Sequence, residues 1–211
     1  MANLREIADF LKAGQAAKVK EAVQKALDEG MSAEKILKEG LIIGMGEIGE
    51  LFKNNEVYVP EVLIAARAMT AGLTILKPIL SAAGVAPAGR VAIGTVKGDL
   101  HDIGKNLVSM MLEGAGFALI DLGIDVSPEK FVDAIENQDV QIVCMSALLT
   151  TTMPNMKSTI DLINAKGLRS KVKIMIGGAP VTQAYADEIG ADGYSDDAAS
   201  AVDLAKKLIG A

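Results

Sequence analysis

The sequence predicts a helical bundle over residues 1–88 and a doubly wound α/β domain with a five-stranded parallel sheet over residues 89–211. In the first part, apolar residues recur at helical spacing. In the second part, short β-branched runs alternate with helical patterns. The segment between them, SAAGVAPAGR, is rich in small residues, glycine and proline, which is typical of a linker. We therefore place the boundary near Ala88.

The N-terminal part is expected to form four or five helices joined by short turns. Gly30 and Ser32 predict a helix end followed by an N-cap, and Asn54-Asn55 interrupts the third amphipathic stretch. Pro60 suits the first turn of a helix that continues through residues 61–80. Helices joined by such short loops usually pack antiparallel. The apolar positions at helical spacing are Leu4, Ile7, Phe10, Leu11, Val19, Val23, Leu27, Ile36, Leu37, Leu41, Ile42 and Met45.

The C-terminal part alternates between strand and helix. Ser127 and Pro128 predict an N-cap with proline in the first helical turn, which suits a crossover helix. Right-handed crossovers place helices on both faces of a parallel sheet, with 2-1-3-4-5 as a common strand order. The expected strands are residues 90–96, 118–123, 140–146, 172–177 and 193–195. The expected helices are residues 103–114, 128–138, 154–166, 182–189 and 198–209.

Composition excludes several classes of protein. The net charge of -6 and the lack of a Lys/Arg run argue against a nucleic-acid partner. A single cysteine, Cys144, cannot form an internal disulfide, and the N-terminus lacks the pattern of a signal peptide. The longest uninterrupted apolar runs are far shorter than a membrane span. We therefore expect a soluble cytoplasmic protein without a membrane partner.

Three unusual loops are expected to meet at one edge of the sheet. GDLHDIGKN follows strand 1, SALLTTTM follows strand 3 and GGAP follows strand 4, and these strands are neighbours in the expected order. Ligands of open α/β sheets bind beyond the carboxyl ends of the strands, where the winding reverses. After strand 1 neither GxGxxG nor GxxxxGK[ST] is present, so the usual dinucleotide and phosphate loops are not predicted there.

The only histidine, His101, lies in the first of these loops between Asp99 and Asp102. Either carboxylate could accept the second N–H of a metal-bound imidazole. A His-Asp general base, a Cys-His nucleophile with Cys144 and a plain loop residue are the alternatives. A hydrolytic zinc site needs about three protein ligands, and no companion ligand is evident. If His101 binds a metal, that metal brings its other ligands with it.

The three loops together resemble a known signature. DLHDIGKN, then SALLTTT, then GG is similar to the D-x-H-x-x-G, S-x-L, G-G signature of base-off/His-on cobalamin-binding proteins. The N-terminal bundle resembles the cap that precedes this domain in corrinoid proteins of methyltransferase systems. Both parts are also similar to the cobalamin module of methionine synthase. The resemblance covers nearly the whole chain.

The resemblance implies a role for each matched position. His101 would ligate cobalt in place of dimethylbenzimidazole, Asp99 would hydrogen-bond its other ring nitrogen, and Thr152 would complete the relay where the family usually has serine. Tyr194 would lie near the base of the nucleotide tail, and apolar side chains within residues 56–69 would cover the upper cobalt face. The slot for the displaced tail would be lined by Gly104, Ser146, Leu148, Thr150, Gly177 and Gly178.

The same resemblance implies a methyl carrier that is not catalytic alone. Its cofactor would be cobalamin or a related corrinoid, alternating between cob(I)alamin and methylcobalamin. A substrate:corrinoid methyltransferase would load it, and a second methyltransferase would pass the methyl group to tetrahydrofolate or coenzyme M. A reductive activator would restore oxidised cobalt. The alternatives are a cobalamin-dependent sensor and the small subunit of a cobalamin-dependent mutase.

Overall fold

The computed structural model of this chain describes residues 3–210. The chain divides into two compact units. One contains the helices up to Ala86 and the short segment Gly114–Gly116, and the other contains Pro87–Glu113 and the chain from Phe117 onward. We describe the helical unit first and the sheet unit second.

The N-terminal unit is helical, as the sequence predicts. Its buried side chains include Ile7, Leu11, Val19 and Leu41, which stand at the expected helical spacing. A π-helical turn interrupts the third predicted helix, and the pattern of apolar residues gave no sign of it. The elements are α1 (Leu4–Lys12), α2 (Ala16–Asp28), α3 (Ala33–Ile36), the π-helix η1 (Leu37–Ile42), α4 (Ile43–Lys53) and α5 (Val59–Ala82).

The turns of this unit form where the sequence places them. The hydroxyl of Ser32 accepts a hydrogen bond from the N–H of Lys35 and caps α3. Asn55 adopts a left-handed backbone conformation (φ 58°) just after α4. Pro60 stands in the first turn of α5, and the carboxylate of Glu61 accepts a hydrogen bond from the N–H of Tyr58.

Within residues 3–210, α5 is the one helix whose length and composition would let it cross a membrane. This differs from the expectation that no segment approaches spanning length. No single apolar run is long, but Glu61, Arg67 and Lys77 are spaced widely enough that the mean hydropathy of an 18-residue window reaches 1.5. Of that window 44% is buried, and the core helices of soluble proteins also meet this criterion.

The sheet unit contains five parallel strands in the predicted order β2-β1-β3-β4-β5. β1 has the expected bounds, and each other strand differs from its expected bounds by one to three residues at one end, most at β2, which continues to Val126 instead of ending at Gly123. The strands are β1 (Arg90–Val96), β2 (Ala118–Val126), β3 (Ile142–Ser146), β4 (Lys173–Gly177) and β5 (Gly193–Tyr194). The helices are α6 (Ile103–Gly114), α7 (Pro128–Asn137), α8 (Pro154–Ala165), the 3-10 turn η2 (Arg169–Lys171), α9 (Gln183–Ile189) and α10 (Ala198–Ile209).

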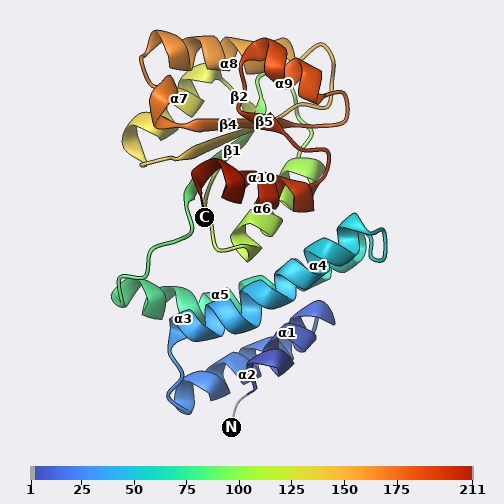
Figure 1. Cartoon of the computed structure of the whole chain (residues 1–211), viewed down its shortest axis with the longest axis vertical. Helices are drawn as coiled ribbons and strands as arrows, with labels where there is room; N and C mark the ends of the chain where they lie inside the picture. The colour runs from blue at the N-terminus through green and yellow to red at the C-terminus, as the bar shows by residue number, and fades with distance from the viewer. Residues whose placement is uncertain (1–2, 211) are drawn as a thin grey trace. The chain divides into compact units, whose positions relative to one another are not determined.

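Helices cover both faces of this sheet (Figure 1). α7, α8 and α9 lie on one face, where Phe131, Met156 and Ile189 pack with alternate residues of the strands, such as Ala92 and Val143. α6 and α10 lie on the other face (Figure 1). Because side chains alternate along a strand, each central strand contributes to both layers, which explains their nearly continuous apolar sequences.

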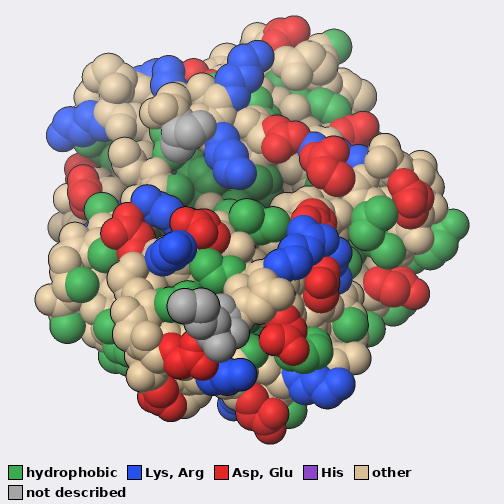
Figure 2. All heavy atoms as spheres, turned by 60° about the horizontal axis from the view of Figure 1, so that its bottom comes forward, with side chains coloured by type: hydrophobic (Ala, Val, Ile, Leu, Met, Phe, Trp, Pro, Cys, Tyr) green, Lys and Arg blue, Asp and Glu red, His purple; other side chains and the backbone are tan. Residues whose placement is uncertain are grey.

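Charged side chains are mixed on the surface. On the face shown in Figure 2, Lys and Arg side chains alternate with Asp and Glu among the described residues, without a stripe of one sign. Such a face does not provide the continuous basic track that binds a nucleic-acid backbone.

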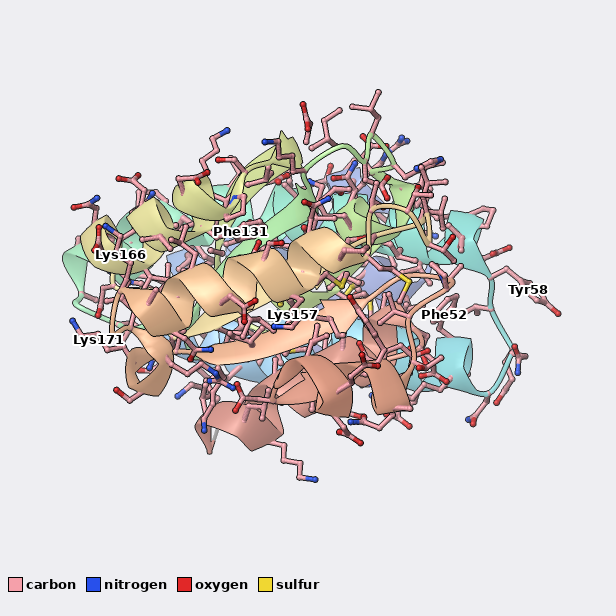
Figure 3. All side chains as sticks on the ribbon, turned by 90° about the horizontal axis from the view of Figure 1, so that it is seen from above. Phe52, Tyr58, Phe131, Lys157, Lys166 and Lys171 are labelled. Carbon is pink, nitrogen blue, oxygen red and sulfur yellow. The ribbon has the colours of Figure 1, made fainter. Side chains whose placement is uncertain are left out.

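Phe131 provides a test of the sheet unit's core. Its side chain on α7 is fully buried, and a Cβ on Gly94 would lie 3.0 Å from the ring. Figure 3 shows it beneath α7, whereas Lys157 lies on the outer surface of α8. Phe131→Ala is expected to lower the free energy of unfolding by about 3–5 kcal/mol, because it removes a buried ring and leaves a cavity. Urea unfolding followed by circular dichroism measures this.

The matched control is Lys157→Ala, which removes only an exposed ion pair with Asp161. Its expected cost is about 0.5 kcal/mol or less. Equal costs for the two variants would contradict the assignment of Phe131 to the core.

Candidate functional site

The carboxyl ends of the central strands align in one row. Thr95 of β1 is in register with Ser146 of β3, and Ser146 is in register with Gly177 of β4. Tyr194 pairs with Ile176, one residue before the row. The loops that follow these strands therefore start side by side, as the strand order predicts, and one of them carries His101.

The buried carboxylate of Asp99 holds the imidazole of His101. His101 Nδ1 lies 2.7 Å from Asp99 Oδ1, and the N–H of His101 donates to the same oxygen at 3.1 Å. The side chain of Asp99 is fully buried, whereas that of His101 is 51% exposed. His101 Nε2 makes no hydrogen bond within residues 3–210. One edge of the imidazole is thus fixed and the other is open.

The second oxygen of Asp99 is bound by the loop after β3. Asp99 Oδ2 accepts hydrogen bonds from the N–H of Leu148 at 2.8 Å and from the hydroxyl of Thr152 at 2.7 Å. Burial by itself would raise the pKa of Asp99, but these two donors and His101 outweigh it and hold that pKa well below its usual range. Asp99 is therefore ionised, and since a carboxylate only accepts, the proton of the shared bond belongs to His101 Nδ1.

Asp102, the rival partner for the imidazole, does not contact it. Its carbonyl accepts a hydrogen bond from the N–H of Asn106, and its carboxylate accepts one from the side-chain amide of the same residue. Asp102 directly precedes α6, where a negative charge is favoured by the helix dipole.

Three residues that the sequence analysis did not select also hold this loop. The hydroxyl of Thr95 donates to the carbonyl of His101 at 2.8 Å, and the side-chain amide of Asn155 donates to the carbonyl of Lys97 at 2.9 Å. Asp125, at the end of β2, accepts the N–H of Gly98 at 2.7 Å. Thr95 lies in β1, Asn155 in the first turn of α8 and Asp125 near the end of β2, so these contacts come from three different elements.

A further contact that the sequence analysis did not predict lies at the start of α6. The buried Lys105 donates to both carboxylate oxygens of Asp121 on β2, at 2.6 Å each. Asp121 also accepts the N–H of Gly123 at a bulge of β2. The ion pair joins α6 to the edge strand, just downstream of the histidine loop. It satisfies a buried ammonium group that would otherwise be costly.

A contact within the chain explains why position 178 is a glycine. It adopts φ 127°, and a Cβ there would lie 1.9 Å from the carbonyl oxygen of Ala147. The group that lies close to the Gly178 backbone is therefore the loop after β3. At Gly104, in contrast, an added Cβ meets nothing within 4 Å, so the space there is open.

The remaining selected residues vary in exposure. Ser146, Gly177 and Tyr194 are half-buried, and Tyr194 also packs against the core. Thr150 is exposed, whereas the side chain of Thr152 is buried. The N-cap of α8 is Met153, so no side-chain hydroxyl caps this helix.

Exposed apolar side chains lie near His101 in the sequence and also in the loop after β3. Leu100 and Ile103 flank His101, and Leu148 and Leu149 follow the strand next to it. Ile103 is 79% exposed and Leu100 is 67% exposed, which is unusual for large aliphatic residues. We call these four residues the apolar rim. An apolar rim beside a fixed polar group is typical of a site for an organic ligand.

The alternative chemistries fit the structure poorly. Cys144 is buried in β3, and burial raises the pKa of its thiol to about 12, which does not suit a nucleophile. Within residues 3–210, no group of three or more His, Cys, Asp and Glu side chains is arranged to hold a metal ion. His101 thus presents a single imidazole with a fixed orientation and a free Nε2.

Comparisons with known proteins agree with this geometry. Residues 89–203 match the family described as "B12 binding domain", and residues 4–77 match a second family of the same description. The chain is 44% identical to dimethylamine corrinoid protein 3 of Methanosarcina acetivorans over 98% of its length and 96% of that protein.

Solved structures give the same result. A cobalamin-binding protein from Desulfitobacterium hafniense has a TM-score of 0.82 at 32% identity, covering 99% of both chains. A chain of the methanol:cobalamin methyltransferase complex MtaBC from Methanosarcina barkeri has a TM-score of 0.85 at 30% identity, covering 97% of this chain and 78% of that one. The chain with the Asp99-bound His101 therefore belongs to the corrinoid proteins of methyltransferase systems, which bind a corrinoid through B12-binding domains.

Proposed function

We propose that this protein is a methyl carrier in which His101 is the lower axial ligand of a corrinoid in the base-off/His-on form. The observation that carries the proposal is the orientation of the imidazole. Asp99 holds Nδ1, while Nε2 is free on a side chain that is half exposed. A metal-bound imidazole usually has this arrangement, with its other nitrogen on a carboxylate.

The residues around His101 fit a corrinoid. A single protein ligand suffices for a metal that is already held in a macrocycle. The apolar rim, Leu100, Ile103, Leu148 and Leu149, offers aliphatic contacts to a large ring. The open space at Gly104 offers room for a displaced nucleotide tail. When bound, the corrinoid supplies a cobalt centre that receives a methyl group from one partner and gives it to another.

The chain itself orients the ligand and sets its basicity. Asp99 accepts the Nδ1 proton, which fixes the tautomer and strengthens Nε2 as a donor to a metal. Thr152 and the N–H of Leu148 keep Asp99 ionised in its buried position. We propose that the tail would contact Gly104, Ser146, Leu148, Thr150, Gly177, Gly178 and Tyr194, which follow or end neighbouring strands.

The partners follow from the carrier role. We propose that a substrate:corrinoid methyltransferase loads the protein, that a second methyltransferase passes the methyl group to tetrahydrofolate or coenzyme M, and that a reductive activator restores oxidised cobalt. Methylated amines are the donor class that we favour, because dimethylamine corrinoid proteins are 44% identical to this chain. We place this function in the cytoplasm, in agreement with a free, buried Cys144.

Nitrogen coupling to cobalt(II) tests the axial ligand directly. The protein is loaded with cobalamin, reduced to cobalt(II) and studied by electron paramagnetic resonance after labelling with ¹⁵N-histidine. The chain has one histidine, so any change of the nitrogen splitting from a triplet to a doublet must come from His101. We expect this change in the wild type and its loss in His101→Ala. A triplet that persists in the labelled wild type would mean that another nitrogen, such as dimethylbenzimidazole, is the ligand.

Thr152 tests the relay behind the ligand. Thr152→Val keeps the shape of the side chain but removes the hydroxyl that donates to Asp99 Oδ2. The affinity for hydroxocobalamin, measured by absorbance titration, is expected to fall about 10-fold, at the lower end of the effect typical of groups that support a metal ligand. Thr152→Ser keeps the donor and is expected to bind like the wild type. Equal affinities of the valine and serine variants would exclude a role for the hydroxyl.

The donor class is tested with partner enzymes. The cobalamin-loaded protein in its cobalt(I) state is mixed separately with a dimethylamine, a monomethylamine and a methanol:corrinoid methyltransferase, each with its substrate. Absorbance changes report methylation of the cobalt. We expect the methylamine enzymes to load this carrier faster than the methanol enzyme. Loading by the methanol enzyme alone would overturn the proposed donor class and leave the carrier role intact.

A further inference from the structure

We propose that Asp125 is a positioning residue for His101, acting through two hydrogen bonds that hold the backbone just before the imidazole. The carboxylate of Asp125 accepts the N–H of Gly98 at 2.7 Å, and the N–H of Asp125 donates to the carbonyl of Asp99 at 3.0 Å. We call this pair of bonds the Asp125 clip. The proposal rests on the proposed function of His101, but it concerns a property of the chain that exists without a cofactor.

The clip joins the edge strand to the histidine loop. Asp125 is the next-to-last residue of β2. Gly98, which lies 27 residues earlier in the chain, and Asp99 follow the end of β1. Val96 and Val126 are still paired as strand residues. The clip continues the contact between the two strands past the last residue of β1, into the segment where regular strand pairing has ended.

The backbone at both sides of the clip is in the left-handed region. Gly98 has φ 80°, which glycine adopts freely, but Asp125 has φ 51°, which is unfavourable for most side chains. Aspartate tolerates this region better than most residues. Glycine would satisfy the backbone at position 125 without strain. The aspartate therefore has a reason in its side chain, and the bond to Gly98 supplies one.

The effect of the clip reaches the imidazole through Asp99. The backbone of Asp99 is held at both of its polar groups, since its N–H donates to the carbonyl of Val96 and its carbonyl accepts from the N–H of Asp125. Its carboxylate in turn accepts the N–H and Nδ1 of His101. Because hydrogen bonds weaken steeply with misalignment, a looser Asp99 backbone would loosen the orientation of the imidazole. Asp125 itself does not contact His101.

Three variants separate positioning from general stability. Asp125→Gly accepts the left-handed backbone and removes only the carboxylate. Asp125→Asn keeps a side-chain oxygen and the tolerance for positive φ, and it should restore the clip. Asp192→Ala is the matched control. Asp192 also accepts a backbone N–H, from Ile174 at 2.7 Å, and it pairs with Arg169 at 2.8 Å, but it lies near the start of β4, at the end of the sheet away from the histidine loop.

The first measurement uses the protein without cofactor, produced without a histidine tag. In ¹⁵N-histidine-labelled protein at mildly alkaline pH, the ring of His101 gives the only imidazole signals. We expect well-separated Nδ1 and Nε2 shifts in the wild type, because Asp99 fixes one tautomer. In Asp125→Gly these shifts should move toward each other, and the amide of Gly98 should exchange faster with solvent. Asp125→Asn and Asp192→Ala should both resemble the wild type.

The second measurement is the affinity for hydroxocobalamin by absorbance titration. Asp125→Gly is expected to bind about 3- to 10-fold more weakly, less than the 10–100-fold typical of groups that bond a metal ligand directly, since Asp125 acts one step further away. Asp125→Asn is expected to restore binding. If the glycine variant does not fold by circular dichroism, all variants are measured in a stabilising osmolyte such as sucrose, with the same expectations.

Two results would overturn the proposal. One is a folded Asp125→Gly protein with wild-type ring shifts and wild-type protection of the Gly98 amide. The other is an Asp192→Ala protein that changes both signals as much as Asp125→Gly does. Neither depends on cobalt ligation. A failure of His101 to ligate cobalt would appear in the wild-type resonance spectrum instead, so the two proposals fail separately.

Discussion

The site depends on one buried negative charge. A fully buried carboxylate is costly unless its oxygens are hydrogen-bonded, and Asp99 meets this demand with donors from two loops. Leu148 and Thr152, which supply the donors from the second loop, are 49 and 53 residues away from it in the chain. If the loop after β3 moved, the charge would lose its partners. The orientation of His101 is therefore tied to the packing of the whole carboxyl edge of the sheet.

The strand order explains how distant segments reach one carboxylate. β1 lies inside the sheet, between β2 and β3, so its following loop has a neighbour on each side. The loop after β3 neutralises the side chain of Asp99, and the end of β2 holds its backbone through Asp125. Lys105 adds a further bond to β2 through Asp121. The switch point of a doubly wound sheet, between β1 and β3 in this strand order, is where ligands of such sheets bind.

The proposed single protein ligand would explain why the chain needs so little other chemistry. A protein that binds a bare metal ion must supply several ligands, whereas a corrinoid would bring its metal already held in a macrocycle. The chain provides one imidazole, a carboxylate that tunes it and an apolar rim. Methyl transfer then depends on the enzymes that meet the carrier, which is consistent with its family.

The sequence by itself determined the fold class and the strand order, because hydrophobic periodicity and loop composition are local properties. It also placed the loop with His101 at the same end of the sheet as the loops after β3 and β4. It also singled out Asp99 and Thr152, but only through the resemblance of DLHDIGKN and SALLTTT to a known signature. Local composition left Asp99 and Asp102 as rival partners of the imidazole, the resemblance favoured Asp99, and the structure shows the imidazole bonded to Asp99. It also revealed Thr95, Lys105 and Asp125, since their contacts join segments whose separation in the sequence carries no periodic signal.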